Sequence, residues 1–152
     1  MDVIYNQEKW SNIKHEMIPL VSLHWEECNK SGKEPFDLDE KQYDNLCSTG
    51  NFIIITARYK EKLIGYVASL IFPNINLKNV LTSFEMGWYV SLEFRKTRVG
   101  VLLRSKTEAA LKDLNVKIMD AAIPCDGRLD KLMNNLGWSK SEVHYKKYIG
   151  DN

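Results

Sequence analysis

Two long runs of β-branched and apolar residues occupy the middle of the sequence, at 52–58 and 63–72. A short polar segment, Lys60-Glu61-Lys62, separates them, which is the pattern of an antiparallel β-hairpin. A third run, about 83–91, contains Gly87, as a β-bulge or a close backbone approach would require. These runs predict a sheet whose first strands are antiparallel.

The order of elements changes after the third strand. The apolar spacing predicts a helix that starts near Arg98, a strand over 116–123, a short helix over 129–136 ended by Gly137, and a last strand over 143–149. The fold class expected is therefore α/β (α+β), with a mixed and mostly antiparallel central sheet flanked by helices.

Two helices are expected before the hairpin. Residues 9–30 carry an apolar stripe at helical spacing, but Pro19 interrupts it, so we expect a kink or two shorter helices near Ile18. A second, short helix is expected over 37–47, with Asp37 or Asp39 as its N-cap.

The composition is that of one globular domain, and we assign residues 1–152 to it. The chain has 152 residues, 44% of them hydrophobic, and 21 basic against 20 acidic side chains. It has neither a run long enough to span a membrane nor a signal-peptide pattern at its start. Its odd number of widely spaced cysteines fits neither a disulfide framework nor a zinc site, so a cytoplasmic location is expected, with Cys28, Cys47 and Cys125 reduced.

Basic residues concentrate where a strand runs through a turn into a helix. Between positions 95 and 112 lie Arg95, Lys96, Arg98, Arg104, Lys106 and Lys112. A helix N-terminus offers free backbone N–H groups and a positive dipole end, so a pyrophosphate fits there. The charge suits either a phosphorylated cofactor or nucleic acid.

The sequence of this turn, Arg-Lys-Thr-Arg-Val-Gly at 95–100, resembles the acetyl-CoA loop Q/R-x-x-G-x-G/A of the GCN5-related N-acetyltransferase (GNAT) family. Residues 58–66 resemble that family's hairpin, and Asn135-Leu136-Gly137-Trp138 its terminal x-L-G-F turn. Residues 24–27 and Gly50 resemble a subgroup encoded by bacteriophages.

The resemblance implies acetyl-CoA as the cofactor and a splay between the fourth and fifth strands that admits the pantetheine arm. The cofactor-binding residues that it implies are Trp88, Tyr89, Val90, Arg95, Lys96, Thr97, Arg98, Val99, Gly100 and Val101. For the side chains of Trp88 and Tyr89, ordinary core packing is the alternative.

Two positions depart from the family pattern. Arg98 stands where the first loop glycine is expected, although Gly100 retains the second. Met133 stands where many members have a tyrosine general acid, and a thioether cannot donate that proton. Water, Tyr145 or Cys125 would then protonate the leaving thiolate.

Glu85 lies on the third run, where members of the family often place a base that deprotonates the acceptor amine. A partly buried glutamate can have its pKa raised toward working pH. The alternative is a solvated glutamate on a strand face. His24 and Glu27 share a helix face and are candidates for the acceptor pocket, whereas no spacing of ligands indicates a metal.

Two functions are compatible with this sequence. The first is an acetyl-CoA-dependent N-acetyltransferase whose acceptor is a small-molecule or protein amine, acting as a monomer or homodimer. The second is a catalytically silent acyltransferase fold that binds protein or nucleic acid, which Arg98 and Met133 would favour. A nucleic-acid module would lose affinity steeply with salt and release no thiol.

Overall fold

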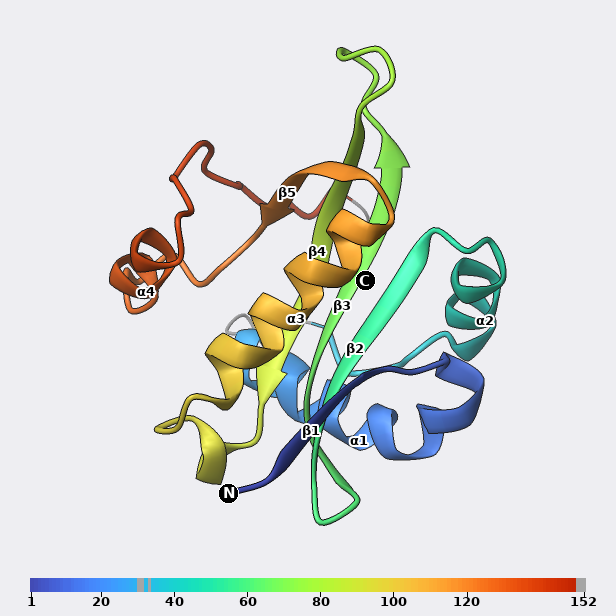
Figure 1. Cartoon of the computed structure of the whole chain (residues 1–152), viewed down its shortest axis with the longest axis vertical. Helices are drawn as coiled ribbons and strands as arrows, with labels where there is room; N and C mark the ends of the chain where they lie inside the picture. The colour runs from blue at the N-terminus through green and yellow to red at the C-terminus, as the bar shows by residue number, and fades with distance from the viewer. Residues whose placement is uncertain (30–31, 33, 150–152) are drawn as a thin grey trace. The chain divides into compact units, whose positions relative to one another are not determined.

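The computed structural model describes residues 1–29, 32 and 34–149, and the chain divides into two compact units, Met1–Ala121 and Ala122–Asn152. The first unit contains one five-stranded sheet in the order β1-β2-β3-β4-β5 (Figure 1). Neighbouring strands are antiparallel except for the parallel pair β4 and β5. The strands are β1 (Val3–Gln7), β2 (Phe52–Tyr59), β3 (Lys62–Pro73), β4 (Leu81–Val90) and β5 (Val116–Ala121).

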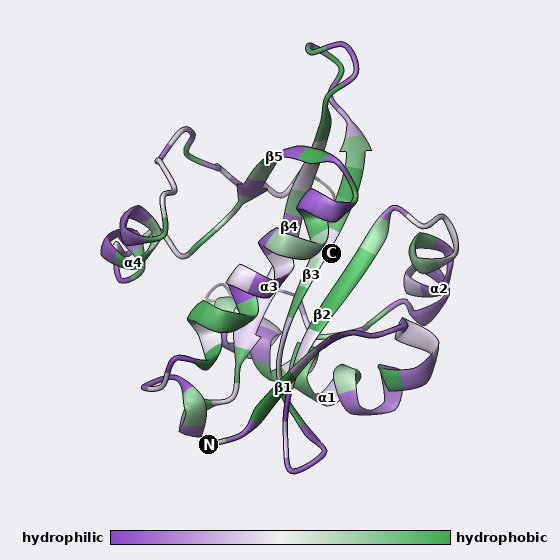
Figure 2. Cartoon of the chain, viewed as in Figure 1, coloured by the Kyte–Doolittle hydropathy of each residue, from purple (hydrophilic) through white to green (hydrophobic). Residues whose placement is uncertain are grey.

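Helices lie on both faces of this sheet (Figure 1). They are α1 (Trp10–Cys28), α2 (Glu40–Ser48), the short 3₁₀ helix η1 (Leu92–Phe94) and α3 (Val99–Asp113). Successive side chains of a strand alternate between faces. Accordingly, Ile53 and Ile55 of β2 join Leu103 of α3 in one core, while Ile54 joins Met17 of α1 in the other. Hydrophobic residues therefore run along the central strands (Figure 2).

The hairpin is confirmed as β2 and β3, and the third strand as β4. The short helix before the hairpin and the helix after the third strand are confirmed as α2 and α3. Lys60 and Glu61 take left-handed φ values of 48° and 66°, which a tight two-residue turn requires. Asp39 is the N-cap of α2, where its carboxylate accepts a hydrogen bond from the Gln42 backbone N–H at 3.1 Å.

Three elements differ from those expected. Of the two alternatives at Pro19, two shorter helices are excluded, since Pro19 lies inside the single helix α1; Pro19 is exposed, so water can reach the carbonyl that loses its N–H partner. Strand β1 was not expected; it is held by its pairing with β2 rather than by a pattern of its own residues. Residues 143–149 form no strand: the alternation of polar and apolar residues stops at Lys146 and Lys147, and every residue of the segment except Tyr148 is exposed, so neither face is buried.

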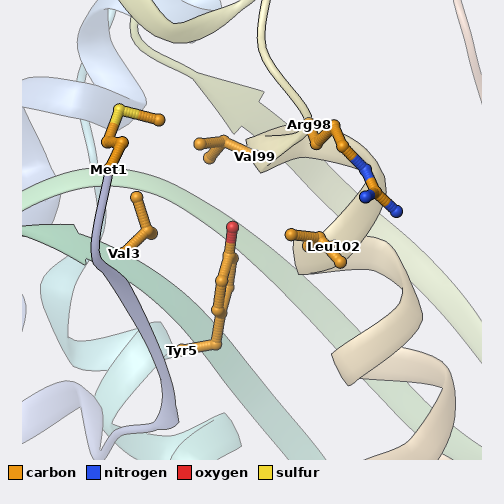
Figure 3. A pocket seen from close by; sticks show the side chains of 6 residues that line it. All are labelled: Met1, Val3, Tyr5, Arg98, Val99 and Leu102. Carbon is orange, nitrogen blue, oxygen red and sulfur yellow. The ribbon is translucent and has the colours of Figure 1, made fainter.

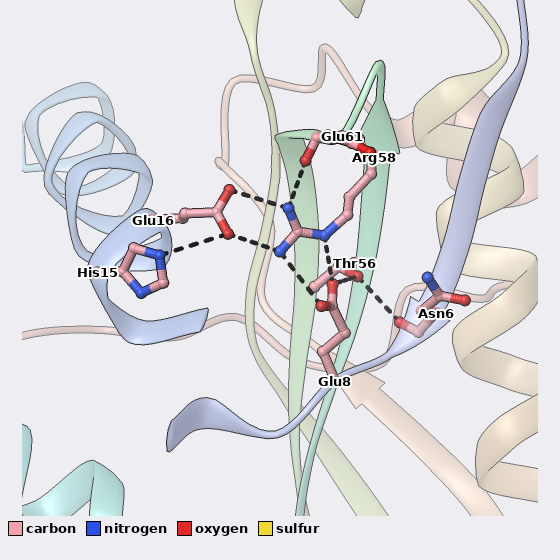
Figure 4. A network of polar contacts seen from close by, with 7 residues as sticks. All are labelled: Asn6, Glu8, His15, Glu16, Thr56, Arg58 and Glu61. Carbon is pink, nitrogen blue, oxygen red and sulfur yellow. Dashed lines mark hydrogen bonds and ion pairs between the residues drawn. The ribbon is translucent and has the colours of Figure 1, made fainter. Parts of the chain in front are cut away.

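An arginine joins β1, α1 and the hairpin (Figure 4). Arg58 of β2 donates hydrogen bonds to Glu8 at 2.9 Å, to Glu16 of α1 at 2.8 and 3.0 Å, and to the backbone carbonyl of Glu61 at 2.6 Å. This arginine lowers the pKa of Glu16. The network fixes α1 against the sheet.

The second unit contains one helix among its described residues, α4 (Asp130–Asn135). Gly137 follows it with φ 83°, the left-handed conformation that ends many helices. Met133 is buried in this helix. In the described part of the chain, no helix has both the length and the apolar character needed to span a bilayer.

Candidate functional site

Strand β4 extends beyond its pairing with β5. The parallel register ends at Glu85 opposite Ala121, while β4 continues to Val90. On its other side, β4 pairs with β3 in a register that shifts at Ala68 and Ser69, which leaves Met86 as an extra, bulged residue. The sheet is therefore open on the β5 side of β4 from Met86 to Val90, directly after a bulge, and this is the stretch where the splay is expected.

The basic turn follows the open end of β4, and its first arginine folds back toward Val90 and α1. Arg95 donates hydrogen bonds to the Val90 carbonyl and to the Glu27 carboxylate, both at 2.7 Å, and its guanidinium lies 5.1 Å from the centre of the Tyr89 ring. Its charge is thus already paired. Lys96 and Arg98 are exposed and carry the positive charge that a ligand could reach.

The first turn of α3 provides backbone donors. Thr97 accepts a hydrogen bond from the Val99 N–H at 3.2 Å, whereas the N–H groups of Gly100 and Val101 fall where a helix has no carbonyl for them. Arg98 is the N-cap residue with φ −78°. The backbone conformation at this position therefore does not require glycine.

Gly100 has a packing role that the sequence did not reveal. A Cβ at this position would lie 3.3 Å from Cζ2 of Trp88 and 3.6 Å from a methyl of Val90. The missing side chain therefore lets α3 approach the open end of β4 closely. The backbone N–H donors at the N-terminus of α3 are thereby held next to that end of the strand.

A pocket of about 220 Å³ lies beside this helix end (Figure 3). Its walls come from β1 and α3, and the Tyr5 ring extends into it with Arg98 at the rim (Figure 3). Burial raises the pKa of Tyr5. No residue of β4 lines the pocket, so it is separate from the opening of the sheet.

Glu85 is buried on the α3 face of β4. It is 7% exposed and accepts a hydrogen bond from Arg104 of α3, which is 2% exposed. The Arg104 guanidinium lies 4.2 Å from the centre of the Trp88 ring. Burial raises the pKa of Glu85 and lowers that of Arg104, and their mutual attraction opposes both shifts. Glu85 is thus a buried, paired group rather than a solvated one.

His24 of α1 occupies the opposite face. Its Nδ1 is 2.8 Å from the Tyr66 hydroxyl, and its ring lies 5.4 Å from that of Tyr89. Glu27, one turn further along α1, forms the 2.7 Å ion pair with Arg95. The structure thus brings His24, Glu27, Tyr89 and Arg95 together.

The remaining candidates lie in the second unit. Tyr145 is 94% exposed and Cys125 is exposed. Their roles as proton donors stay predictions. Among the described residues, no group of three or more His, Cys, Asp or Glu side chains could hold a metal ion.

Sequence reasoning placed Arg104 in the basic cluster that could hold a polyanion, but Arg104 is buried and paired with Glu85. It did not identify Tyr66 as a partner of His24. Arg104 follows Gly100 by one helical turn and precedes the buried Thr107 and Leu111 on the same face, a spacing that could have marked it as a buried charge. Side chains along β3 point alternately to the two faces of the sheet, but the strand pattern alone does not say whether the face of Tyr66 is the one that meets α1.

A model of the acetyltransferase (GNAT) family matches residues 17–129. No curated protein is significantly similar to the chain in sequence.

Solved structures with this fold span nearly the whole chain. Ribosomal-protein-alanine N-acetyltransferase from Brucella melitensis biovar Abortus 2308 aligns with a TM-score of 0.80 and 15% identity over 99% of this chain and 100% of that one. Aminoglycoside acetyltransferase meta-AAC0020 from an uncultured soil metagenomic sample, in complex with sisomicin, has a TM-score of 0.78 and 12% identity over 97% of each chain. AAC(6')-Iy, in complex with the bisubstrate analog CoA-S-monomethyl-acetylneamine, has a TM-score of 0.75 and 16% identity over 98% of this chain and 100% of that one. These TM-scores show a shared fold.

Proposed function

Because this chain belongs to the acetyltransferase (GNAT) family, we propose that it transfers an acetyl group from acetyl-CoA to an amine by direct attack. The observation that carries the proposal is the opening between β4 and β5, which leads to a basic helix N-terminus. A long cofactor with a thioester at one end and a pyrophosphate further along matches such a site.

The residues present fit acetyl-CoA. The N–H groups of Gly100 and Val101, with Lys96 and Arg98, would hold the pyrophosphate, and the backbone of 88–90, beyond the pairing with β5, would line the arm. When bound, acetyl-CoA supplies an activated acetyl thioester. The protein's own contribution is to orient both reactants and to take a proton from the amine.

An amine acceptor is favoured by the structural neighbours. One is named for acetylating a ribosomal-protein alanine, and another was solved with the aminoglycoside sisomicin. Two titratable side chains at the bulge could take the proton, Glu85 on the α3 face and His24 on the α1 face. The cytoplasmic location and the likeness to phage-encoded members stay predictions of the sequence.

Calorimetry with acetyl-CoA tests the cofactor site. Because Lys96 and Arg98 are exposed, the variant Lys96→Glu/Arg98→Glu should fold and yet bind at least about 100-fold more weakly, a loss of about 2.7 kcal/mol. The matched control is Lys41→Glu/Lys62→Glu, which changes net charge equally at exposed sites elsewhere and should keep its affinity.

Release of CoA thiol with a panel of aminoglycosides, amino sugars and peptide N-termini tests the chemistry. Thiol release that depends on the acceptor amine is expected. The absence of acetyl-CoA binding at millimolar ligand would overturn the cofactor site. Binding without thiol release for any acceptor would favour the silent binding module.

A further inference from the structure

We propose that His24, oriented by Tyr66, is the group that takes the proton from the acceptor amine. The inference rests on the proposed function and names a residue of the same site. It is carried by the position of the imidazole at the bulge of β4, on the face where the buried carboxylate of Glu85 does not lie.

Gly87 brings the imidazole to the bulge. A Cβ at this position would lie 3.3 Å from Cε1 of His24 and 3.3 Å from Cε2 of Tyr66. The glycine that breaks the third apolar run therefore leaves room for two side chains to close on the strand. They meet β4 two residues after Glu85, where the pairing with β5 has just ended.

Access favours His24 over Glu85. The side chains of Glu85 and Arg104 are 5% and 2% exposed, under α3, and Arg104 already binds one carboxylate oxygen. An amine would have to displace packed side chains to reach the other oxygen. His24 is partly exposed, and within the described residues its Nε2 has no hydrogen-bond partner.

The surroundings keep the imidazole neutral and ready to accept a proton. Burial lowers the pKa of His24; Glu27 of α1 opposes that shift and Arg95 reinforces it. The other titratable groups facing the ring are the hydroxyls of Tyr66 and Tyr89, and burial raises the pKa of both. Both hydroxyls therefore stay protonated and uncharged at neutral pH.

The hydrogen bond to Tyr66 assigns a role to each ring nitrogen. When Nδ1–H donates to the Tyr66 oxygen, the lone pair of Nε2 is free. The acceptor ammonium gives one proton to Nε2, which leaves a neutral amine and an imidazolium. The imidazolium then returns the proton to solvent, and Tyr66 keeps the ring in one orientation throughout.

Steady-state kinetics of His24→Asn test this role. We expect kcat/KM to fall by about 10²–10⁴-fold, the acidic limb of the pH profile that His24 controls to disappear, and the affinity for acetyl-CoA to stay within threefold of the parent. His15→Asn is the matched control, since His15 lies on the same helix and is exposed, and it should keep the parent rate. In His24→Ala, added imidazole should restore part of the rate, which a loss of packing alone would not allow.

NMR titration of the imidazole in the ligand-free protein gives a readout besides activity. The His24 ring should titrate below the usual range, and in Tyr66→Phe its pKa should fall further, because the imidazolium loses a hydrogen-bond acceptor. The acidic limb of kcat/KM should move in the same direction in that variant.

The outcomes separate the two proposals. A parent that releases no thiol with any amine overturns the proposed function, and the role of His24 with it. An active parent whose His24→Asn variant keeps the rate and the pH profile overturns the role of His24 alone. A pH limb that does not follow the ring titration in Tyr66→Phe also overturns it.

Discussion

The ionisable side chains on the two faces of β4 differ in their exposure to water. On the α3 face, Glu85 and Arg104 form an ion pair that is almost fully buried against Trp88. On the α1 face, His24 is partly exposed, and the neighbouring ion pair between Glu27 and Arg95 has side chains that are 40% and 35% exposed. The two sets of side chains lie against the same stretch of β4 from opposite faces.

This difference follows from how each helix meets the strand. Gly100 lets α3 pack directly on Trp88, so charges beneath that helix are cut off from water and must pair with each other. Gly87 lets a single ring from α1 touch the strand at the bulge. A group that exchanges protons with a substrate must be reachable from solvent, as the His24 ring at the bulge is. A buried ion pair such as Glu85 and Arg104 can instead fix the position of the strand.

Removing one member of the buried pair should have the largest effect. Arg104→Leu leaves the Glu85 carboxylate buried without its cation, and Glu85→Leu leaves the guanidinium, so each should lower the free energy of unfolding by about 3–5 kcal/mol. Urea unfolding measures both.

The double variant Glu85→Leu/Arg104→Leu is the control. With both charges gone, an apolar pair of similar volume should recover most of the loss, so the two single effects should not add. Single variants within 1 kcal/mol of the parent would mean that water reaches this face and that the contrast between the two faces is wrong.

A smaller effect is expected from Arg58→Met. The side chain of Arg58 is 17% exposed and binds Glu8 and Glu16, so its loss leaves two carboxylates close together, and we expect about 2 kcal/mol of destabilisation. Since Glu16 and His24 belong to α1, hydrogen exchange should accelerate in α1 while α3 keeps its protection.

Arg58→Lys separates charge from geometry. Lysine keeps the positive charge but cannot make the forked contacts, so its stability should fall between those of the parent and Arg58→Met. Equal acceleration of exchange in α1 and α3 would mean that the two faces loosen together and are not independent.

The fold was largely predictable because its signals are local. The β-branched runs, the polar turn at Lys60 and Glu61 and the apolar stripe of α3 each fix one element. Two failures depend on contacts that a local pattern does not show: β1 exists through its pairing with β2, and residues 143–149 form no strand because neither face of the segment is buried.

The site was predictable only in part, because a sequence does not say which face of a strand a side chain takes. The basic turn was predicted from its charge and its place before a helix, and Glu85 and Trp88 from the resemblance to the acetyltransferase family. That Arg104 lies over Trp88, and Tyr66 against His24, depends on helix packing across the sheet. The bulge at Met86 shifts the alternation further, so counting along β4 does not give the facing of Gly87 and Tyr89.

The smallest effect expected is a pH dependence of stability from His24. Its pKa in the folded protein is lowered from 6.5 by burial, so between these two values the unfolded chain binds more protons than the folded one. The group has no effect well above pH 6.5, where it is neutral in both states. As pH falls below 6.5, the folded state loses stability by at most about 1.4 kcal/mol per pH unit.

The difference in unfolding free energy between the parent and His24→Asn, measured by urea unfolding from pH 8 to pH 5, isolates this contribution from the carboxylates that titrate at lower pH. It should be constant at high pH and then shift against the parent as pH falls. A shift in favour of the parent would mean that the fold stabilises the imidazolium, with Glu27 outweighing burial. In that case both faces of β4 would hold paired charges, and His24 could not accept a proton near neutral pH.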